Sequence, residues 1–402
     1  MVAVAFLAQG LSSGGTTYLF GLFVKPVAEE FAAQRGPVSL GMSLLTLVQG
    51  VIAPFLGVAL DRRSIRVTMA LGALAMGAGF ALMAAAPSLA TLGLAFGTLI
   101  AFGSLAIGPL SASKLVANWF EATRGRALGV ASTGTSFGGA VLPPLTAWAI
   151  AAWGWRGALA ALGALVVALL LPAVWLLVRN RPEDRGLALD GASAHPAAAA
   201  SPPAPALGVA ELVAQRNFWA LGLAVGLVFA LLGALLVNLH PYATDLGVDA
   251  AAGAWLFTLL SVSGIVGKLV FGALADRVGK RLLMGVGMAM LAGFLLLLLS
   301  EPDYELLAGA CAVVGFALGG FLPIWGALIG ECWGREAFAR VMGLMSPLMS
   351  PLVMAAVAVP GFVHDRTGSY DLAFQGFLGV LALAAVALAL LRVPSRPASE
   401  PV

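Results

Sequence analysis

Lys268 is the residue whose type and position could do the most chemistry, because it places an ammonium group inside an otherwise apolar run at 252–275. It lies about eight residues, or roughly 12 Å along a helix, from the end of that run. A lysine at the centre of a membrane helix costs about 2.5–3.5 kcal/mol, so a lysine at this depth needs an explanation. Gly264 and Gly272 share its helix face, and such small neighbours would leave room for a ligand. We expect Lys268 to hold a small anion; the alternative is an ammonium that only reaches a water-filled vestibule.

Four other side chains could face the same ligand, and each also has a plainer structural interpretation. They are Tyr18, Asn238, His240 and Trp325. The hydroxyl of Tyr18 could donate to a carboxylate oxygen, or the ring could simply pack. Asn238 and His240 stand at the end of an apolar run, where capping of a loop is the competing role. Trp325 could line a cavity or belong to a helix core.

A charged motif occurs twice. Residues 272–281 read GALADRVGKR, and residues 57–66 read GVALDRRSIR, an offset of 215 positions (272 minus 57). The motif residues are Gly57, Asp61, Arg62 and Arg66 in the first copy and Gly272, Asp276, Arg277, Gly279, Lys280 and Arg281 in the second. We expect the first glycine to permit close helix approach and the aspartate to cap a neighbouring helix or pair with a cation. The basic residues should anchor a tight turn, whose bend Gly279 would permit.

Such paired clusters are expected to hold two helix bundles together in one conformation and to release them in another. A topology signal without a gating role is the alternative. Since Ser64 replaces the expected glycine in the first copy, we expect gating to depend more on the second.

The elements that must position these residues are apolar runs of membrane-spanning length. Sixty per cent of the residues are hydrophobic and 10% are charged, against about 25% charged in a soluble domain. The runs cover 3–24, 38–60, 67–86, 91–113, 126–150, 156–178, 217–240, 252–275, 282–300, 304–330, 339–363 and 370–391. This predicts an all-α membrane protein of twelve transmembrane helices in two pseudo-symmetric six-helix bundles, typical of a duplicated transporter. The predicted boundaries are 1–178 and 217–392 for the bundles, 179–216 for a linker with a mobile proline–alanine run, and 393–402 for a tail.

Charge counting predicts the orientation. With both termini in the cytoplasm, most of the 22 basic residues fall in cytoplasmic loops, as the positive-inside rule requires. Lys114, near the cytoplasmic end of a run, is expected to extend its ammonium to the water interface. The net charge of +3 is explained by topology and does not indicate a nucleic-acid partner. The first run lacks a cleavage signal and is expected to be a retained span.

Further stretches resemble a known family. These are YLFG at 18–21, NWF at 118–120, RGRALG at 124–129, GWR at 154–156, RPEDRG at 181–186, HPYA at 240–243 and DRTGSY at 365–370. With the two copies of the charged motif, the chain resembles the major facilitator superfamily, and within it the monocarboxylate transporters and oxalate:formate antiporters. Members carry an arginine in the eighth span, four residues before the motif glycine, and Lys268 occupies that position. The chain departs from the family at Gly264, where animal carriers have an acidic residue, and lacks the second cation that oxalate exchangers carry in the eleventh span.

The resemblance implies a secondary transporter of a small monocarboxylate or similar organic anion, working by alternating access, functional as a monomer in the inner (plasma) membrane. If a proton is the coupling ion, Lys268 or His240 would have to titrate. The alternative is an exporter of a drug-like or uncharged compound. An enzyme is not expected, because the runs contain no clustered catalytic groups. No metal site, cofactor or ATP-binding loop is predicted either, since Cys311 and Cys332 stand alone and no G-x-x-x-x-G-K-[ST] occurs.

Overall fold

The computed structural model describes residues 1–32, 35–191, 208–248 and 250–393. The proline–alanine run of the linker and the tail beyond Val393 lie outside the described residues, as does the side chain of His240. Within the described part the chain forms helices and no strand, so the predicted all-α class is confirmed.

The N-terminal half begins with a broken first segment. It consists of α1 (Val2–Ser13), a π-helical turn η1 (Gly14–Tyr18) and α2 (Phe20–Glu30). The remaining elements of this half are α3 (Arg35–Arg62), α4 (Ile65–Ala84), α5 (Leu89–Ala95), the π-helical turn η2 (Phe96–Ile100), α6 (Ala101–Ile107), α7 (Pro109–Trp119) and α8 (Arg124–Leu177). The predicted break between 150 and 156 appears as a sharp kink inside α8. Gly154 has non-helical dihedral angles, φ 71° and ψ 169°, and its positive φ suits glycine, so two helical stretches meet there without an intervening loop.

The C-terminal half consists of longer, less interrupted helices. These are α10 (Arg216–Asp245), α11 (Ala250–Leu274), α12 (Lys280–Leu298), α13 (Tyr304–Trp333), α14 (Phe338–Thr367) and α15 (Asp371–Leu390). Ten helical stretches of the described residues are long and apolar enough to cross a membrane. The helix α8, with 54 residues, is long enough to cross twice, and the broken first segment is not among the ten. The count of twelve stays a prediction, as do the cytoplasmic termini.

The chain between the halves is folded against the N-terminal half before the proline–alanine run. It forms the short helices η3 (Pro182–Arg185) and η4 (Leu189–Gly191), followed after the gap by α9 (Val209–Ala214). Asp190 accepts hydrogen bonds from the backbone amides of Glu121, Ala122 and Thr123 at 2.9–3.1 Å, just before α8 begins.

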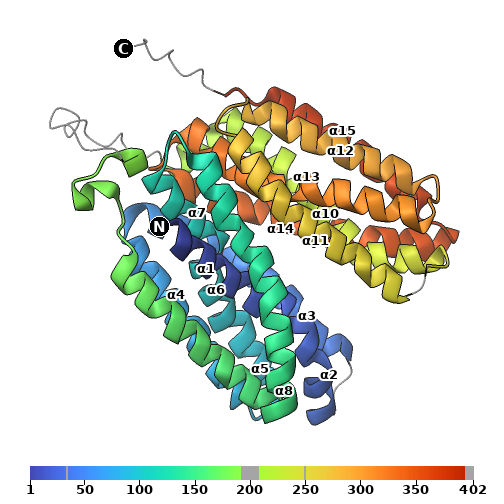
Figure 1. Ribbon diagram of the computed structural model, residues 1–402, viewed down its shortest axis with the longest axis horizontal. Coiled ribbons are helices and arrows are strands. Elements are labelled where there is room, and N and C mark those ends of the chain that lie inside the picture. Colours follow the sequence, from blue (N-terminus) through green and yellow to red (C-terminus); the bar gives the residue numbers. More distant parts are fainter. Residues whose placement is uncertain (33–34, 192–207, 249, 394–402) are drawn as a thin grey trace.

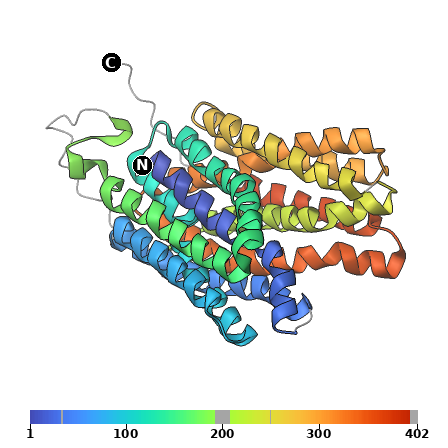
Figure 2. The same ribbon diagram turned by 60° about the horizontal axis from the view of Figure 1, so that its bottom comes forward.

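The two halves form a V (Figure 1). They meet at the end that carries the N-terminus and the chain joining the halves, and they diverge toward the other end, where α2 and the far ends of the C-terminal helices lie (Figures 1 and 2). Two helix pairs make the main contact between the halves, α3 with α14 and α8 with α11. We call these the two seams.

Candidate functional site

Glycines let the helices touch at both seams. A Cβ atom on Gly272 of α11 would lie 2.8 Å from the Cα of Gly129 in α8, closer than side chains are found. At the other seam, a Cβ on Gly343 of α14 would lie 3.3 Å from the Cα of Gly57 in α3. Since Gly57 and Gly272 are equivalent motif positions, the two crossings are copies of one arrangement.

The motif aspartates cap helices of the opposite half. Asp276 accepts the amides of Gly125 and Arg126 at 2.6 and 2.8 Å, at the start of α8, which has no cap from its own side chains. Asp61 accepts the amides of Ala339 and Arg340 at 3.3 and 2.8 Å, at the start of α14. A carboxylate at a helix N-terminus satisfies free N–H groups and meets the positive end of the helix dipole. Each bundle therefore caps the N-terminus of a helix in the other bundle.

Asp61 has an additional partner, and here one expectation is wrong. Lys114 does not extend to the water interface: its side chain is buried and its Nζ lies 2.8 Å from Asp61 Oδ1. The same ammonium donates to the carbonyl of Arg335 in the loop before α14. The Arg340 guanidinium, also buried, lies 3.9 Å from Asp61 Oδ2. A buried charge is strongly destabilising unless an opposite charge pairs with it. Because Lys114 pairs with the carboxylate that caps α14, it is part of the α3–α14 seam.

Three of the remaining motif residues, Arg66, Lys280 and Arg281, contact residues of their own half. Arg281 donates to the carbonyls of Ala389 and Leu391 at the end of α15, at 2.7 and 3.2 Å. Lys280 lies 3.4 Å from Glu331. Arg66 stacks over the ring of Trp175 at 4.2 Å. Arg62 and Arg277 are exposed.

Gly279 does not have the role expected of it. Its φ and ψ of −56° and 117° are open to any residue, and a Cβ there would meet open space. The equivalent Ser64 has nearly the same backbone, with φ −69° and ψ 119°, and its hydroxyl caps α4 by accepting the amide of Val67 at 3.4 Å. The backbone at this position therefore does not require glycine in either copy, and which copy gating depends on stays a prediction.

Lys268 lies at the α8–α11 seam, one turn from the contact between Gly129 and Gly272. Its Nζ is 2.7 Å from both Thr135 Oγ1 and Ser136 Oγ on α8, so the ammonium bridges the two halves. Both partners are neutral hydroxyls, and no ion pair joins Lys268 to a carboxylate among the residues that the structure describes. An ammonium whose hydrogen-bond partners are neutral hydroxyls has no counter-charge of its own and could bind an anion.

Of the three lesser candidates whose side chains the structure describes, it brings one near this point. Tyr18, 46% exposed, lies against α8 at Gly139, one turn from the hydroxyls that hold Lys268. Asn238 donates to the carbonyls of Ala234 and Val357, at 2.8 and 3.1 Å, and ties α10 to α14. Trp325 is buried against Phe229, with ring centroids 5.9 Å apart, inside the C-terminal half.

Sequence reasoning missed Thr135, Ser136 and the pair of Lys114 with Asp61. Ser136 belongs to a stripe of small residues on its helix, and that pattern favours a packing role over a hydrogen-bonding one. The signal that could have found the partner of Lys114 is the charged motif itself. A second cation at the end of an apolar run could need an anion, and Asp61 is the motif acid of the same half.

Comparison with known proteins agrees with this architecture. The family model of the Major Facilitator Superfamily matches residues 5–242 and 221–402. Monocarboxylate transporter 11 of Mus musculus is 30% identical, over 93% of this chain and 83% of its own. The uncharacterized MFS-type transporter YcxA of Bacillus subtilis is 26% identical, over 94% and 91%.

Solved structures share the fold at low sequence identity. The human organic anion transporter MFSD10 superposes with a TM-score of 0.70 at 18% identity, covering 96% of this chain and 98% of that one. The transporter FucP, in its outward conformation, gives a TM-score of 0.72 at 16% identity, covering 98% and 99%. This chain is a multi-pass membrane protein and belongs to the Major Facilitator Superfamily of transporters.

Proposed function

We propose that this protein carries a small monocarboxylate or similar organic anion across the membrane by alternating access, with Lys268 as the anchor for the carboxylate. The observation that carries the proposal is the uncompensated ammonium of Lys268, held at the seam between the halves by Thr135 and Ser136. An anion binding there would contact a cation at a seam that must open and close during transport.

The repeat argues for one carboxylate rather than two. The position equivalent to Lys268 in the first copy of the motif is Ala53 (268 minus 215), which carries no charge. The helix α14 opposite it has no lysine or arginine between 341 and 363. A single charged anchor fits a single carboxylate, as in the relatives named monocarboxylate transporters. The likeness in fold to MFSD10, an organic anion transporter, is in keeping with this class.

The arrangement of the seams suggests which state this is. The halves are joined by two aspartate caps at the end that we predict to be cytoplasmic, and they diverge toward the other. We infer an outward-facing state, as in the outward conformation of FucP. In this proposal the protein works as a monomer in the inner (plasma) membrane, and a coupled proton would be handled by Lys268 or His240.

Uptake of radiolabelled lactate or pyruvate into proteoliposomes tests the proposal. Wild type should show saturable uptake, Lys268→Ala should abolish it, and Lys268→Arg should retain part, since arginine keeps the charge. Thermal unfolding of each variant separates loss of the anchor from loss of fold. Saturable carboxylate uptake by Lys268→Ala would remove Lys268 from the mechanism. Uptake of uncharged compounds that carboxylates do not compete with would favour an exporter of such compounds.

A further inference from the structure

A groove with a mostly apolar lining runs between α12 and α15, on the side of the C-terminal half away from the N-terminal half (Figure 1). The two helices are in contact and lie side by side at that edge (Figure 1). The groove has a volume of about 780 Å³, and small residues widen it on both helices. They are Gly285, Ala289 and Ala292 on α12 and Ala382, Ala385 and Ala389 on α15.

The length of the groove matches one leaflet of a bilayer. The apolar part of its lining on α12 extends from Leu282 to Ala292, which is about 15 Å at ~1.5 Å per residue. One leaflet contributes roughly 15 Å of hydrocarbon. Gly285 leaves open space at its Cβ position, so the groove is not filled from within the protein there. An acyl chain lying along the two helices would fill it.

A cationic hollow of about 550 Å³ continues the groove at the end where the two halves meet. Gly279, Arg281 and Ala389 line both, so the two are continuous. Arg216, Lys280, Arg281 and Arg392 surround the hollow, and Glu331 is the acidic residue in its lining. Glu331 lies 3.4 Å from Lys280, and the lining holds no second carboxylate for Arg216 and Arg392, which are exposed.

The backbone adds to the positive field. Helix α12 begins at Lys280, and its first N–H groups have no side-chain cap, whereas Ser64 caps the equivalent helix α4. Free N–H groups at the start of a helix favour an anion. An apolar groove as long as one leaflet, ending at a cluster of cations on the side that we predict to be cytoplasmic, has the composition of an anionic lipid site.

We propose that this groove and hollow bind one anionic phospholipid, with an acyl chain between α12 and α15 and the phosphate among Arg216, Arg281 and Arg392. Neither Lys268 nor its partners Thr135 and Ser136 line the groove or the hollow, so the site is separate from the proposed substrate anchor. It would attach the C-terminal half, at the turn that follows the motif aspartate Asp276, to the cytoplasmic leaflet.

Native mass spectrometry of the full chain tests this, after delipidation and addition of dioleoyl phosphatidylglycerol or dioleoyl phosphatidylcholine. Wild type should retain the anionic lipid in preference to the zwitterionic one. The double variant Arg216→Gln/Arg392→Gln should weaken retention of phosphatidylglycerol by roughly fivefold per charge removed, hence about 25-fold, and leave phosphatidylcholine unchanged. Gly285→Leu should reduce retention of both lipids, because it fills the groove.

Matched variants control for charge and bulk. Arg63→Gln/Arg126→Gln removes two exposed charges from the N-terminal half, and Gly376→Leu adds the same side chain to α15 outside the groove, where a Cβ also meets open space. Both should behave as wild type. Equal retention of the two lipids by wild type would overturn the proposal, as would undiminished phosphatidylglycerol binding in Arg216→Gln/Arg392→Gln. A wild-type mass of two chains that Gly285→Leu converts to one would assign the groove to a second copy instead.

Discussion

Asp61 and Lys114 form an ion pair 2.8 Å long, with 1% of one side chain and 3% of the other exposed. The pair joins α3 to α7 within the N-terminal half, while the same carboxylate caps α14 of the other half. The second motif copy differs, because Asp276 caps α8 at the other seam and has no ion pair within 4.0 Å among the described residues. The two seams therefore share their backbone geometry, but only the aspartate of the α3–α14 seam has a buried lysine as its partner among the described residues.

This difference predicts a large loss of stability in Lys114→Met, because it would leave the Asp61 carboxylate buried beside Arg340 alone. Breaking a buried pair by removing one partner costs about 3–5 kcal/mol. Denaturant titration of the purified protein in detergent measures this change in the free energy of unfolding. The matched control is Lys280→Met, whose half-buried partner Glu331 lies 3.4 Å away and whose loss should cost about 1 kcal/mol or less. Equal losses in the two variants would mean that Lys114 is not required at the seam.

The fold was largely predictable, because spans and duplication are encoded in patterns that one sequence displays. Long apolar runs and the repeated motif need no tertiary information. The π-helical turns at 14–18 and 96–100 were not predictable, because they depend on packing between helices. Periodicity does not report such packing.

The candidate site was predictable in one residue and not in its surroundings. Lys268 stands out because a charge inside an apolar run is costly. Its partners Thr135 and Ser136 are more than 130 positions away, and only the crossing of α8 with α11 brings them together. The expectation for Lys114 was wrong for the same reason, since its partner belongs to another helix.

Two glycines of one motif should respond in opposite ways to substitution. Gly272→Ala should destabilise the α8–α11 seam, because its Cβ would lie 2.8 Å from backbone atoms of Gly125 and Gly129. Gly279→Ser should be neutral or stabilise the protein by up to about 1 kcal/mol, since it can cap α12 as Ser64 caps α4. Melting temperatures in one detergent measure both. A loss in Gly279→Ser as large as that in Gly272→Ala would show that Gly279 is required in another conformation.

The pair of Glu30 with Arg156, at the end where the halves diverge, should make the stability of the protein depend on pH. The hydrogen bond from Arg156, at 2.7 Å, holds the pKa of the Glu30 carboxyl below its ordinary value of 4.5. Because the folded pKa is lowered, the contribution of the pair is fully present above pH 4.5 and is lost as the pH falls through the folded pKa. The melting temperature of wild type should therefore exceed that of Glu30→Gln at about pH 6 to 7, and the difference should shrink below about pH 4. A difference that grew on acidification would contradict this sign.

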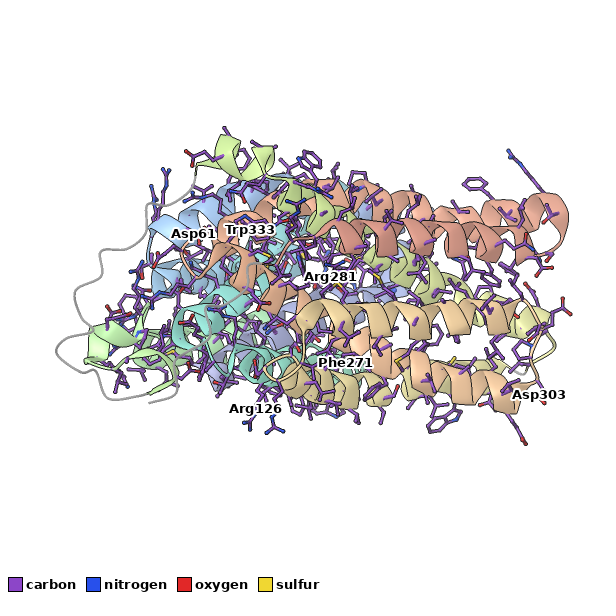
Figure 3. The ribbon with its side chains drawn as sticks, turned by 90° about the horizontal axis from the view of Figure 1, so that it is seen from above. Asp61, Arg126, Phe271, Arg281, Asp303 and Trp333 are labelled. Atoms are coloured by element: carbon purple, nitrogen blue, oxygen red, sulfur yellow. The ribbon has the colours of Figure 1, made fainter. Side chains whose placement is uncertain are left out.

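Weakening the aspartate cap of α8 should let the two halves separate at the end where they meet, without unfolding the protein. Asp276→Asn removes the negative charge at the start of α8 and one of its two acceptor oxygens, which should cost about 0.3–2 kcal/mol of seam stability and shift the population toward states in which the halves separate at this end. Spin labels at Arg63 and Arg392, exposed residues in different halves, would report a longer component in their distance distribution. Asp303→Asn is the control, because Asp303 caps α13 within one half by accepting the amide of Leu306 at 2.9 Å and lies at the opposite end from Asp61 (Figure 3). It should leave the distances unchanged. If Asp276→Asn also leaves them unchanged, the α8–α11 seam is held by helix packing at Gly129 and Gly272, and the aspartate does not gate it.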